Sequence, residues 1–372
     1  MRKKGDCICM PYNVIGEGKK RLHYLDLAKG LSITEVVLYH LFVHLNDIPP
    51  IVNSISLFRL PLFFFLSGLF FKEYESFVGF SLRKVNKLLI PFLFFYFITS
   101  FAMPNILYMF GYTVKHVESL GLSGLWAFIT KEEFSNSPLW FLWALFLLNI
   151  YFYTILLSVK KITKNPKIIA FCITVIGFAI GFLGSAYLAV PPRYNVPGFA
   201  DSSMSALPFF VMGYLLMNFT DILAPNKWDK YLPFLVIICF SLTFYVSGSC
   251  SYKMNIYHIN PLLQYFCGMS GTLGVVFTAK MLRNLPFITY WGRCSLMILV
   301  THGVLLQIYV PIGRRFMSGL PQFVMVFIIL IVVMFSYQVL IPMMKKLIPY
   351  FTAQKDLINV SKYVSDKCRS AL

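Results

Sequence analysis

Four polar side chains with acid–base chemistry stand inside one long apolar stretch, residues 22–45: Asp26, Lys29, His40 and His44. Lys29 and His40 are eleven positions apart, so on a helix they share one face about 16 Å apart. Asp26 and His44 fall within about 40° of His40, one on each side. Ionisable groups inside a membrane helix cost a few kcal/mol and usually serve a reaction or a pathway. The stripe indicates proton transfer, since a neutral imidazole accepts protons near pH 7.

A structural interpretation of the same stripe stays open. Asp26 and Lys29 have the i,i+3 spacing of an ion pair at the membrane surface, with the Lys29 ammonium reaching the headgroups. The two histidines can equally hydrogen-bond neighbouring helices. Glu35 points about 140° away from the stripe and takes part in neither interpretation.

A second group of charges, Arg83, Lys84 and Lys87, directly precedes the apolar stretch 88–110. Basic residues at the mouth of a span orient a helix in the membrane. They also bind phosphate groups of an anionic substrate that arrives from the cytoplasm. The pattern alone is compatible with both roles.

The composition defines the elements that position these groups. Hydrophobic residues make up 58% of the 372 residues, charged residues 13%, and the mean hydropathy is +0.70. These values exclude a soluble protein, a disordered chain and a small disulfide-stabilised domain. Because about 20 apolar residues cross a membrane as a helix, we predict an all-α polytopic membrane protein with about ten transmembrane helices. The predicted spans are 22–45, 56–72, 88–110, 138–159, 168–188, 204–220, 231–247, 260–281, 287–311 and 321–348.

Lys and Arg residues alternate in density between successive loops. Both tails and the loops after even-numbered spans carry 24 of them, counted with Lys72, Lys280, Lys345 and Lys346 at the ends of the adjoining spans, and the remaining loops carry six. The positive-inside rule then predicts cytoplasmic termini, with a basic tail (1–21), a transmembrane domain (22–348) and a second tail (349–372). The net charge of +18 is spread over these loops, so it indicates an anionic lipid surface and no nucleic-acid partner.

The eight cysteines show no disulfide framework and predict no metal site. Most lie inside apolar stretches or in the basic tails, and Cys250 is expected on an external loop. Cys7-Ile8-Cys9 has no second pair and no histidine nearby, which a zinc site needs.

Several motifs follow one another in the order known from one membrane family. They are Lys29-x10-His40 within Leu25-Asp26-Leu27-Ala28-Lys29-Gly30, then Pro61-Leu62-Phe63-Phe64-Phe65-Leu66-Ser67-Gly68, Arg83-Lys84-x-x-Lys87 before Pro91, Pro138-Leu139-Trp140-Phe141-Leu142, Pro208-Phe209-Phe210-x-x-Gly213-Tyr214, and Gly292-x-x-Ser295 ahead of His302. With these motifs residues 22–345 resemble the acyltransferase-3 membrane family, most closely its fucose 4-O-acetylase-like, polysaccharide-modifying branch. Glu35, Arg59 and His44 depart from the family's pattern, which affects acceptor specificity more than reaction class.

The resemblance implies transfer of an acyl group, usually acetyl from acetyl-CoA, to a hydroxyl of a sugar. Such a reaction needs a base for the hydroxyl proton, a positive or hydrogen-bonding environment for the oxyanion, and exclusion of water. We expect His40 to be the base or, in a covalent variant, to carry the acyl group as an acyl-imidazole. Lys29 and Asp26 complete the predicted catalytic set nearer the cytoplasm, where Lys29 acts on the donor or on channel electrostatics. His44 stays the alternative base.

Donor and acceptor are expected to approach from opposite sides of the plasma membrane. Arg83, Lys84 and Lys87 would bind the phosphates of cytoplasmic acyl-CoA, and a sugar or polysaccharide acceptor would enter from the outer side. The residues predicted to line the acceptor pocket are His44, Ser67, Trp140 and His302.

A transporter or flippase of a glycan or small anion is the alternative function, because a proton-coupled carrier also needs a polar stripe across its helices. Many carriers are built from repeats. Residues 22–188 and 204–348 show no such correspondence.

Overall fold

The fold is almost entirely helical. A computed structural model describes residues 22–74, 76–109, 136–189, 196–246 and 248–360, together with Trp126 and Tyr363. In this described part the strands β1 (Cys250–Ser251) and β2 (Ile256–Tyr257) pair as a short antiparallel hairpin, and the other regular elements are helices. The prediction of an all-α polytopic membrane protein is therefore confirmed. The predicted basic tail, residues 1–21, lies outside the described residues.

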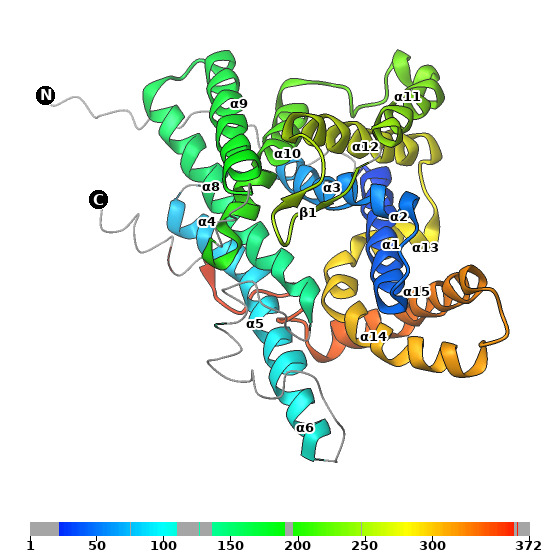
Figure 1. Cartoon of the computed structure of the whole chain (residues 1–372). Helices are drawn as coiled ribbons and strands as arrows, with labels where there is room; N and C mark the ends of the chain where they lie inside the picture. The colour runs from blue at the N-terminus through cyan, green and yellow to red at the C-terminus, as the bar shows by residue number, and fades with distance from the viewer. Residues whose placement is uncertain are drawn as a thin grey trace, which may run out of the picture.

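Figure 1 shows how the helices are arranged. In chain order they are α1 (His23–Leu45), α2 (Pro50–Ser54), α3 (Ser56–Leu69), α4 (Phe77–Lys84), α5 (Ile90–Tyr96), α6 (Met103–Met109), α8 (Trp140–Ile162), α9 (Pro166–Phe182), α10 (Ala200–Phe219), α11 (Leu232–Tyr245), α12 (Pro261–Leu282), α13 (Pro286–Arg293), α14 (Ser295–Phe316) and α15 (Gln322–Leu347). The π-helical turns are η1 (Val85–Leu89), η2 (Phe97–Ala102) and η5 (Leu183–Tyr187), and the 3₁₀ turns are η4 (Ser137–Leu139), η6 (Pro197–Phe199) and η7 (Lys227–Tyr231).

Helix α1 packs on five other helices, which are α3, α12, α13, α14 and α15. It ends where Asn46 adopts a left-handed conformation with φ of 57°, which asparagine tolerates better than most residues. Most of its apolar side chains are buried against these neighbours. The polar stripe of α1 is thus held by protein on several sides.

Two glycines bring α1 and α13 into backbone contact. A Cβ atom at Gly30 would collide with the carbonyl oxygen of Ile288, and one at Gly292 would collide with the carbonyl oxygen of Asp26. Small residues allow this close approach of membrane helices. Both glycines stand in the sequence motifs around Lys29 and Ser295, so part of each motif serves packing.

Eight helical stretches of the described chain are long and apolar enough to cross a membrane. The other two predicted spans also form helices but fall short of that measure. Helix α11 has only 14 residues. Helix α1 has 23 residues, among them Asp26, Lys29 and Glu35, whose charges lower its hydropathy.

Two predicted boundaries are wrong. The predicted span 88–110 begins earlier, because Phe77–Ile106 is one continuous helical stretch, and the basic cluster therefore lies on the helix and not before it. The predicted span 287–311 is two helices, since the backbone leaves the helical region at Cys294, where φ is −112° and ψ is 18°. Arg293 and His302 consequently belong to different helices, α13 and α14.

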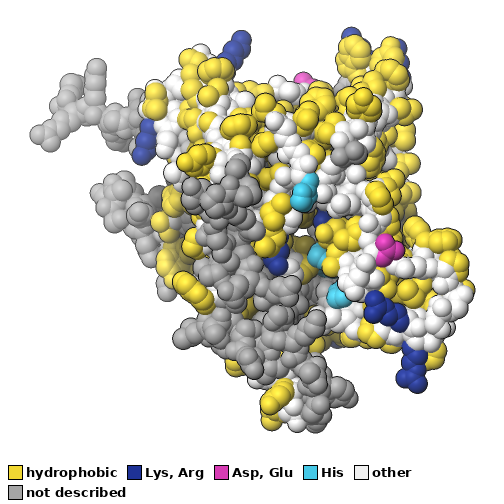
Figure 2. Space-filling model, in the orientation of Figure 1, with side chains coloured by type: hydrophobic (Ala, Val, Ile, Leu, Met, Phe, Trp, Pro, Cys, Tyr) yellow, Lys and Arg dark blue, Asp and Glu magenta, His cyan; other side chains and the backbone are white. Residues whose placement is uncertain are grey.

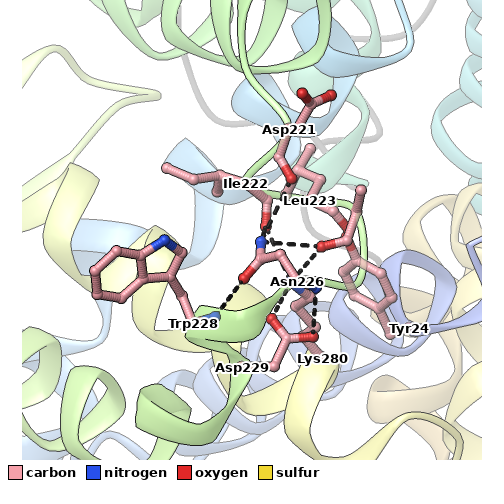
Figure 3. A network of polar contacts seen from close by, with 9 residues as sticks. Tyr24, Asp221, Ile222, Leu223, Asn226, Trp228, Asp229 and Lys280 are labelled. Atoms are coloured by element: carbon pink, nitrogen blue, oxygen red, sulfur yellow. Dashed lines mark hydrogen bonds and ion pairs between the residues drawn. The ribbon is translucent and has the colours of Figure 1, made fainter.

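A polar network ties the loop before η7 to two helices (Figure 3). The Lys280 ammonium of α12 donates to Asp229 at 2.6 Å and to the carbonyl oxygens of Ile222 and Ala224 at 3.0 and 2.8 Å. The Tyr24 hydroxyl of α1 donates to the carbonyl oxygen of Leu223 at 2.7 Å. The network fixes the first turn of α1 at the end of the bundle that the Lys and Arg distribution assigns to the cytoplasm. We call this end inner and the opposite end outer.

Candidate functional site

A cavity of about 430 Å³ opens beside the first half of α1. Its wall comes from α1, α3, α4, η1, α8, α13, α14 and the segment after α15. Basic side chains dominate its polar lining, and we call it the inner pocket. The basic residues are Lys29, Arg83, Lys84, Lys87 and Arg293, and the acidic ones are Asp26 and Asp356.

The structure places the predicted cluster Arg83, Lys84 and Lys87 together in the wall of this pocket. The Arg83 guanidinium lies 4.6 Å from the centre of the Tyr74 ring, and the Lys84 ammonium lies 5.2 Å from that of Phe80. Cations over aromatic faces keep their N–H groups available at the edges. Such a wall can bind a ligand with several phosphates.

Lys29 and Asp26 lie at the inner pocket and not at His40. The Lys29 ammonium is 4.1 Å from the centre of the Phe70 ring, and Asp26 forms an ion pair with Arg293 at 3.4 Å. Along α1 these two residues are about 16 and 21 Å from His40. The structure therefore does not bring the predicted catalytic set together at one reacting atom.

Two polar atoms of the inner pocket have no hydrogen-bond partner among the described residues. They are Oδ1 of the Asn149 side-chain amide and Nε of Arg83. Asn149 is 1% exposed, and its amide nitrogen donates to the Leu145 carbonyl oxygen at 2.7 Å. Sequence reasoning missed Asn149, although an amide inside the apolar span 138–159 was a signal for it. One acceptor and one donor in residues of the pocket wall are thus buried without a hydrogen bond.

Part of the predicted C-terminal tail closes one side of the inner pocket. The Asn86 side chain exchanges two hydrogen bonds of 2.8 Å with the backbone of Ile358. Lys87 forms an ion pair with Asp356 at 2.9 Å and donates to the Ala353 carbonyl oxygen at 2.9 Å. No local sequence pattern could show that residues more than 260 positions apart share a wall.

Further out along α1, the His40 ring faces the His302 ring of α14. The ring centres are 5.1 Å apart and the planes are inclined by 52°. His302 is fully buried, and its Nδ1 lies 3.0 Å from the carbonyl oxygen of Ile298. His40 thus faces protein, and we call the two histidines and their surroundings the imidazole site.

Two cations belong to these surroundings. The buried Arg59 guanidinium lies 3.4 Å from the centre of the Tyr39 ring, and the Lys253 ammonium donates to Ser137 Oγ at 2.8 Å. The Tyr39 ring in turn meets the His40 ring edge to face, with centres 5.5 Å apart, and Asn136 next to Ser137 donates to the Val300 carbonyl oxygen at 2.8 Å. Arg59 is one of the departures from the family pattern, and its place beside His40 could not be read from its position in the sequence.

The β1–β2 hairpin reaches the same region. Cys250 packs on Ser56 at the start of α3, donating its backbone N–H to Ser56 Oγ at 2.9 Å. Burial raises the pKa of the Cys250 thiol to about 12, so this group stays neutral. Figure 2 shows that the face between the hairpin and α1 is hollowed, with histidine and Lys or Arg side chains along the hollow.

The predicted acceptor residues do not form one pocket. Ser67 lines the inner pocket together with the basic residues. Trp140 is buried against Phe199, with ring centres 5.6 Å apart. His44 lies one turn beyond His40, where its carbonyl oxygen accepts from Arg314 at 3.0 Å. Of the four residues, His302 is the one in ring contact with His40.

The wall of the inner pocket does not include His40. On α1 the lining ends at Ile33, seven positions before His40, and on α3 it includes Leu60 and Phe63. The rings of Phe63 and Phe141 meet edge to face with centres 5.8 Å apart. Both rings line the inner pocket.

The chain matches a known protein family over most of its length. The family model described as an acyltransferase domain, of the acyltransferase-3 type, matches residues 22–340. The match includes every residue of the imidazole site and the basic wall of the inner pocket, and it ends before Asp356. Among proteins of curated function and among solved structures, none matches the chain.

Proposed function

The chain belongs to the acyltransferase-3 family of membrane proteins, and from this premise we propose that it moves an acyl group from acyl-CoA to a sugar hydroxyl of an exported or cell-surface glycan. We further propose acetyl as the acyl group, the fucose 4-O-acetylase-like branch as its subfamily, and the plasma membrane as its location.

One observation carries the proposal. The same helix, α1, contributes Lys29 to the inner pocket and His40 to the imidazole site three turns further out. A single rigid element thus connects a phosphate-binding region with a base. Acyl transfer from a cytoplasmic donor to an external acceptor needs this arrangement.

The hydrogen-bonding groups in the wall of the inner pocket suit acyl-CoA, the proposed acyl donor. Five basic residues in its wall suit the phosphates of CoA. The unpartnered Asn149 oxygen and Arg83 Nε add an acceptor for an amide N–H and a further donor for a phosphate. Acyl-CoA would supply the activated thioester.

At the imidazole site His40 accepts the proton of the acceptor hydroxyl. Its ring is held between α1 and α14 and faces His302. We propose that the Phe63–Phe141 contact is a barrier between the two regions, which keeps water of the inner pocket away from the base until the acyl group displaces it. The hollow between the hairpin and α1 gives a sugar access from the outer side (Figure 2).

The test measures CoA release by the purified protein in detergent, with and without an oligosaccharide acceptor. His40→Ala is expected to lower kcat by about 10²- to 10⁴-fold, the usual contribution of a general base, with little change in the KM for acyl-CoA. His258→Ala is the matched control, because His258 is exposed on the loop after the hairpin. Full turnover in His40→Ala would refute the role of His40. A dead His44→Ala beside it would move that role one turn outward.

The same preparation distinguishes the transporter. In vesicles a carrier accumulates the glycan unchanged, whereas an acyltransferase yields an acylated product and free CoA. Accumulation without chemical change would contradict the proposed function.

A further inference from the structure

The hydrogen bond of His302 determines which of its nitrogens carries a proton. Nδ1 lies 3.0 Å from the carbonyl oxygen of Ile298, and a carbonyl can only accept. Nδ1 is therefore the protonated nitrogen of a neutral ring, and Nε2 carries the lone pair. A charged ring would be fully buried without a carboxylate partner among the described residues, which is a costly arrangement.

This lone pair has no hydrogen-bond partner among the described residues, although His302 is 0% exposed. Leaving a buried acceptor unpaired costs about 1–3 kcal/mol. The neighbouring ring is that of His40, with ring centres 5.1 Å apart. Two imidazoles at this separation can form an N–H···N hydrogen bond when they turn edge to edge, and catalytic hydrogen bonds commonly tighten only when substrate is bound.

We propose that His302 is the positioning residue of the acyl transfer. Its Nε2 accepts the N–H of His40, which leaves the lone pair of the other His40 nitrogen for the acceptor hydroxyl. When His40 takes up the hydroxyl proton, this N–H becomes cationic and its hydrogen bond to His302 strengthens. The proton stays on His40 until the leaving thiolate receives it, so His302 neither gains nor loses one. This inference rests on the proposed function of His40.

The surroundings of His302 hold the ring in this orientation. Asn136, before α8, donates to the carbonyl oxygen of Val300 at 2.8 Å. Thr301 hydrogen-bonds the Tyr337 hydroxyl of α15 at 3.1 Å. Contacts at the two residues before His302 thus hold this turn of α14 between Asn136 and α15. A ring with such support can orient the more exposed His40.

Two substitutions of His302 separate its two nitrogens. His302→Asn keeps an amide N–H near the position of Nδ1 but places no acceptor where Nε2 lies. His302→Gln extends an amide oxygen to the position of Nε2. We expect kcat to fall about 100-fold in His302→Asn, the cost of a misoriented catalytic group, and to stay within about tenfold of wild type in His302→Gln. The KM for acyl-CoA should not change in either variant.

Equal loss in both variants would overturn the proposal, because a base or a packing role is not rescued by glutamine. Wild-type kcat in His302→Asn would overturn it too. The double variant His40→Ala with His302→Asn should be no slower than His40→Ala alone, since a positioning residue acts through its partner. Thermal melting in detergent, compared with wild type, excludes variants that do not fold.

A measurement without turnover separates this inference from the proposed function. Nitrogen-15 NMR of the full-length protein labelled at histidine should show His302 protonated at Nδ1 and not at Nε2. The tautomer of His40 should then change in His302→Asn. A His302 ring protonated at Nε2 would refute the positioning role while His40-dependent transfer remained. Absent transfer in wild type, with the expected tautomers, would refute the function.

Discussion

The inner pocket and the imidazole site lie along the same helix but differ in charge and in exposure. The inner pocket gathers five basic side chains around about 430 Å³ of space, and its rim is partly exposed. The imidazole site holds two histidines in ring contact, one of them fully buried. A polyanionic donor needs charge and access, whereas a base needs a neutral ring and little water. The comparison shows why the two regions are separated along α1.

Of the substitutions considered, a charge reversal in the inner pocket should have the largest effect, and that effect should be confined to donor binding. In Arg83→Glu with Lys84→Glu, two phosphate-binding cations become anions, so the KM for acyl-CoA should rise at least about 100-fold. The KM for the acceptor and the kcat at saturating donor should change little, because neither residue reaches His40. Initial rates over a range of both substrates measure these constants.

The matched control carries the same change of charge away from the pocket. Lys161→Glu with Lys167→Glu alters two exposed basic residues around the start of α9. An equal rise of the donor KM in this control would show that the basic residues act on the membrane or on topology. The cluster would then lose its role in binding the donor.

Opening the barrier between the two regions should have an intermediate effect. Phe63→Ala removes one ring of the Phe63–Phe141 contact and connects the inner pocket with the imidazole site. Water then reaches the activated acyl group, and acyl-CoA hydrolysis without acceptor should increase about tenfold. CoA release in the absence of sugar measures this. Phe97→Ala, at a 54% exposed ring, should not increase it.

If Phe63→Ala hydrolysed acyl-CoA no faster than Phe97→Ala, the aromatic contact would not be the barrier. The acyl group would then reach His40 by another path.

The features that could be predicted from the sequence depend on local patterns. The helices longer than 20 residues can be predicted from hydropathy. Lys29 and the basic cluster line one pocket, which agrees with their predicted place at the inner side. The position of His40 three turns from Lys29 follows from helical spacing alone.

The features that were missed depend on contacts between distant residues. Asp356 and Asn86 join the inner pocket through a segment that follows the last helix, and Cys294 breaks a span whose apolar run looks continuous. The motif around Ser67 does not indicate that this residue shares a pocket with Lys29 and the basic cluster. Register and side-chain direction in a bundle come from tertiary packing, which a single sequence does not display.

The smallest effect is expected where the C-terminal segment touches the inner pocket. Asp356 forms an ion pair with Lys87, and these side chains are 39% and 46% exposed. A pair this exposed contributes about 0.2–1 kcal/mol. Asp356→Asn releases Lys87 for a donor phosphate, so the KM for acyl-CoA should fall by no more than about fivefold.

The direction of this change decides what Asp356 does. The wall itself is held by Asn86 and Ile358, whose two hydrogen bonds do not involve Asp356. If Asp356 competes with the donor, Asp356→Asn lowers the KM for acyl-CoA. The control Asp221→Asn removes an exposed carboxylate in the loop before η7 and leaves this KM unchanged. If Asp356 instead supports the wall, the same substitution raises the KM. A higher KM would show that Asp356 stabilises the wall of the inner pocket and that only the basic residues affect donor binding directly.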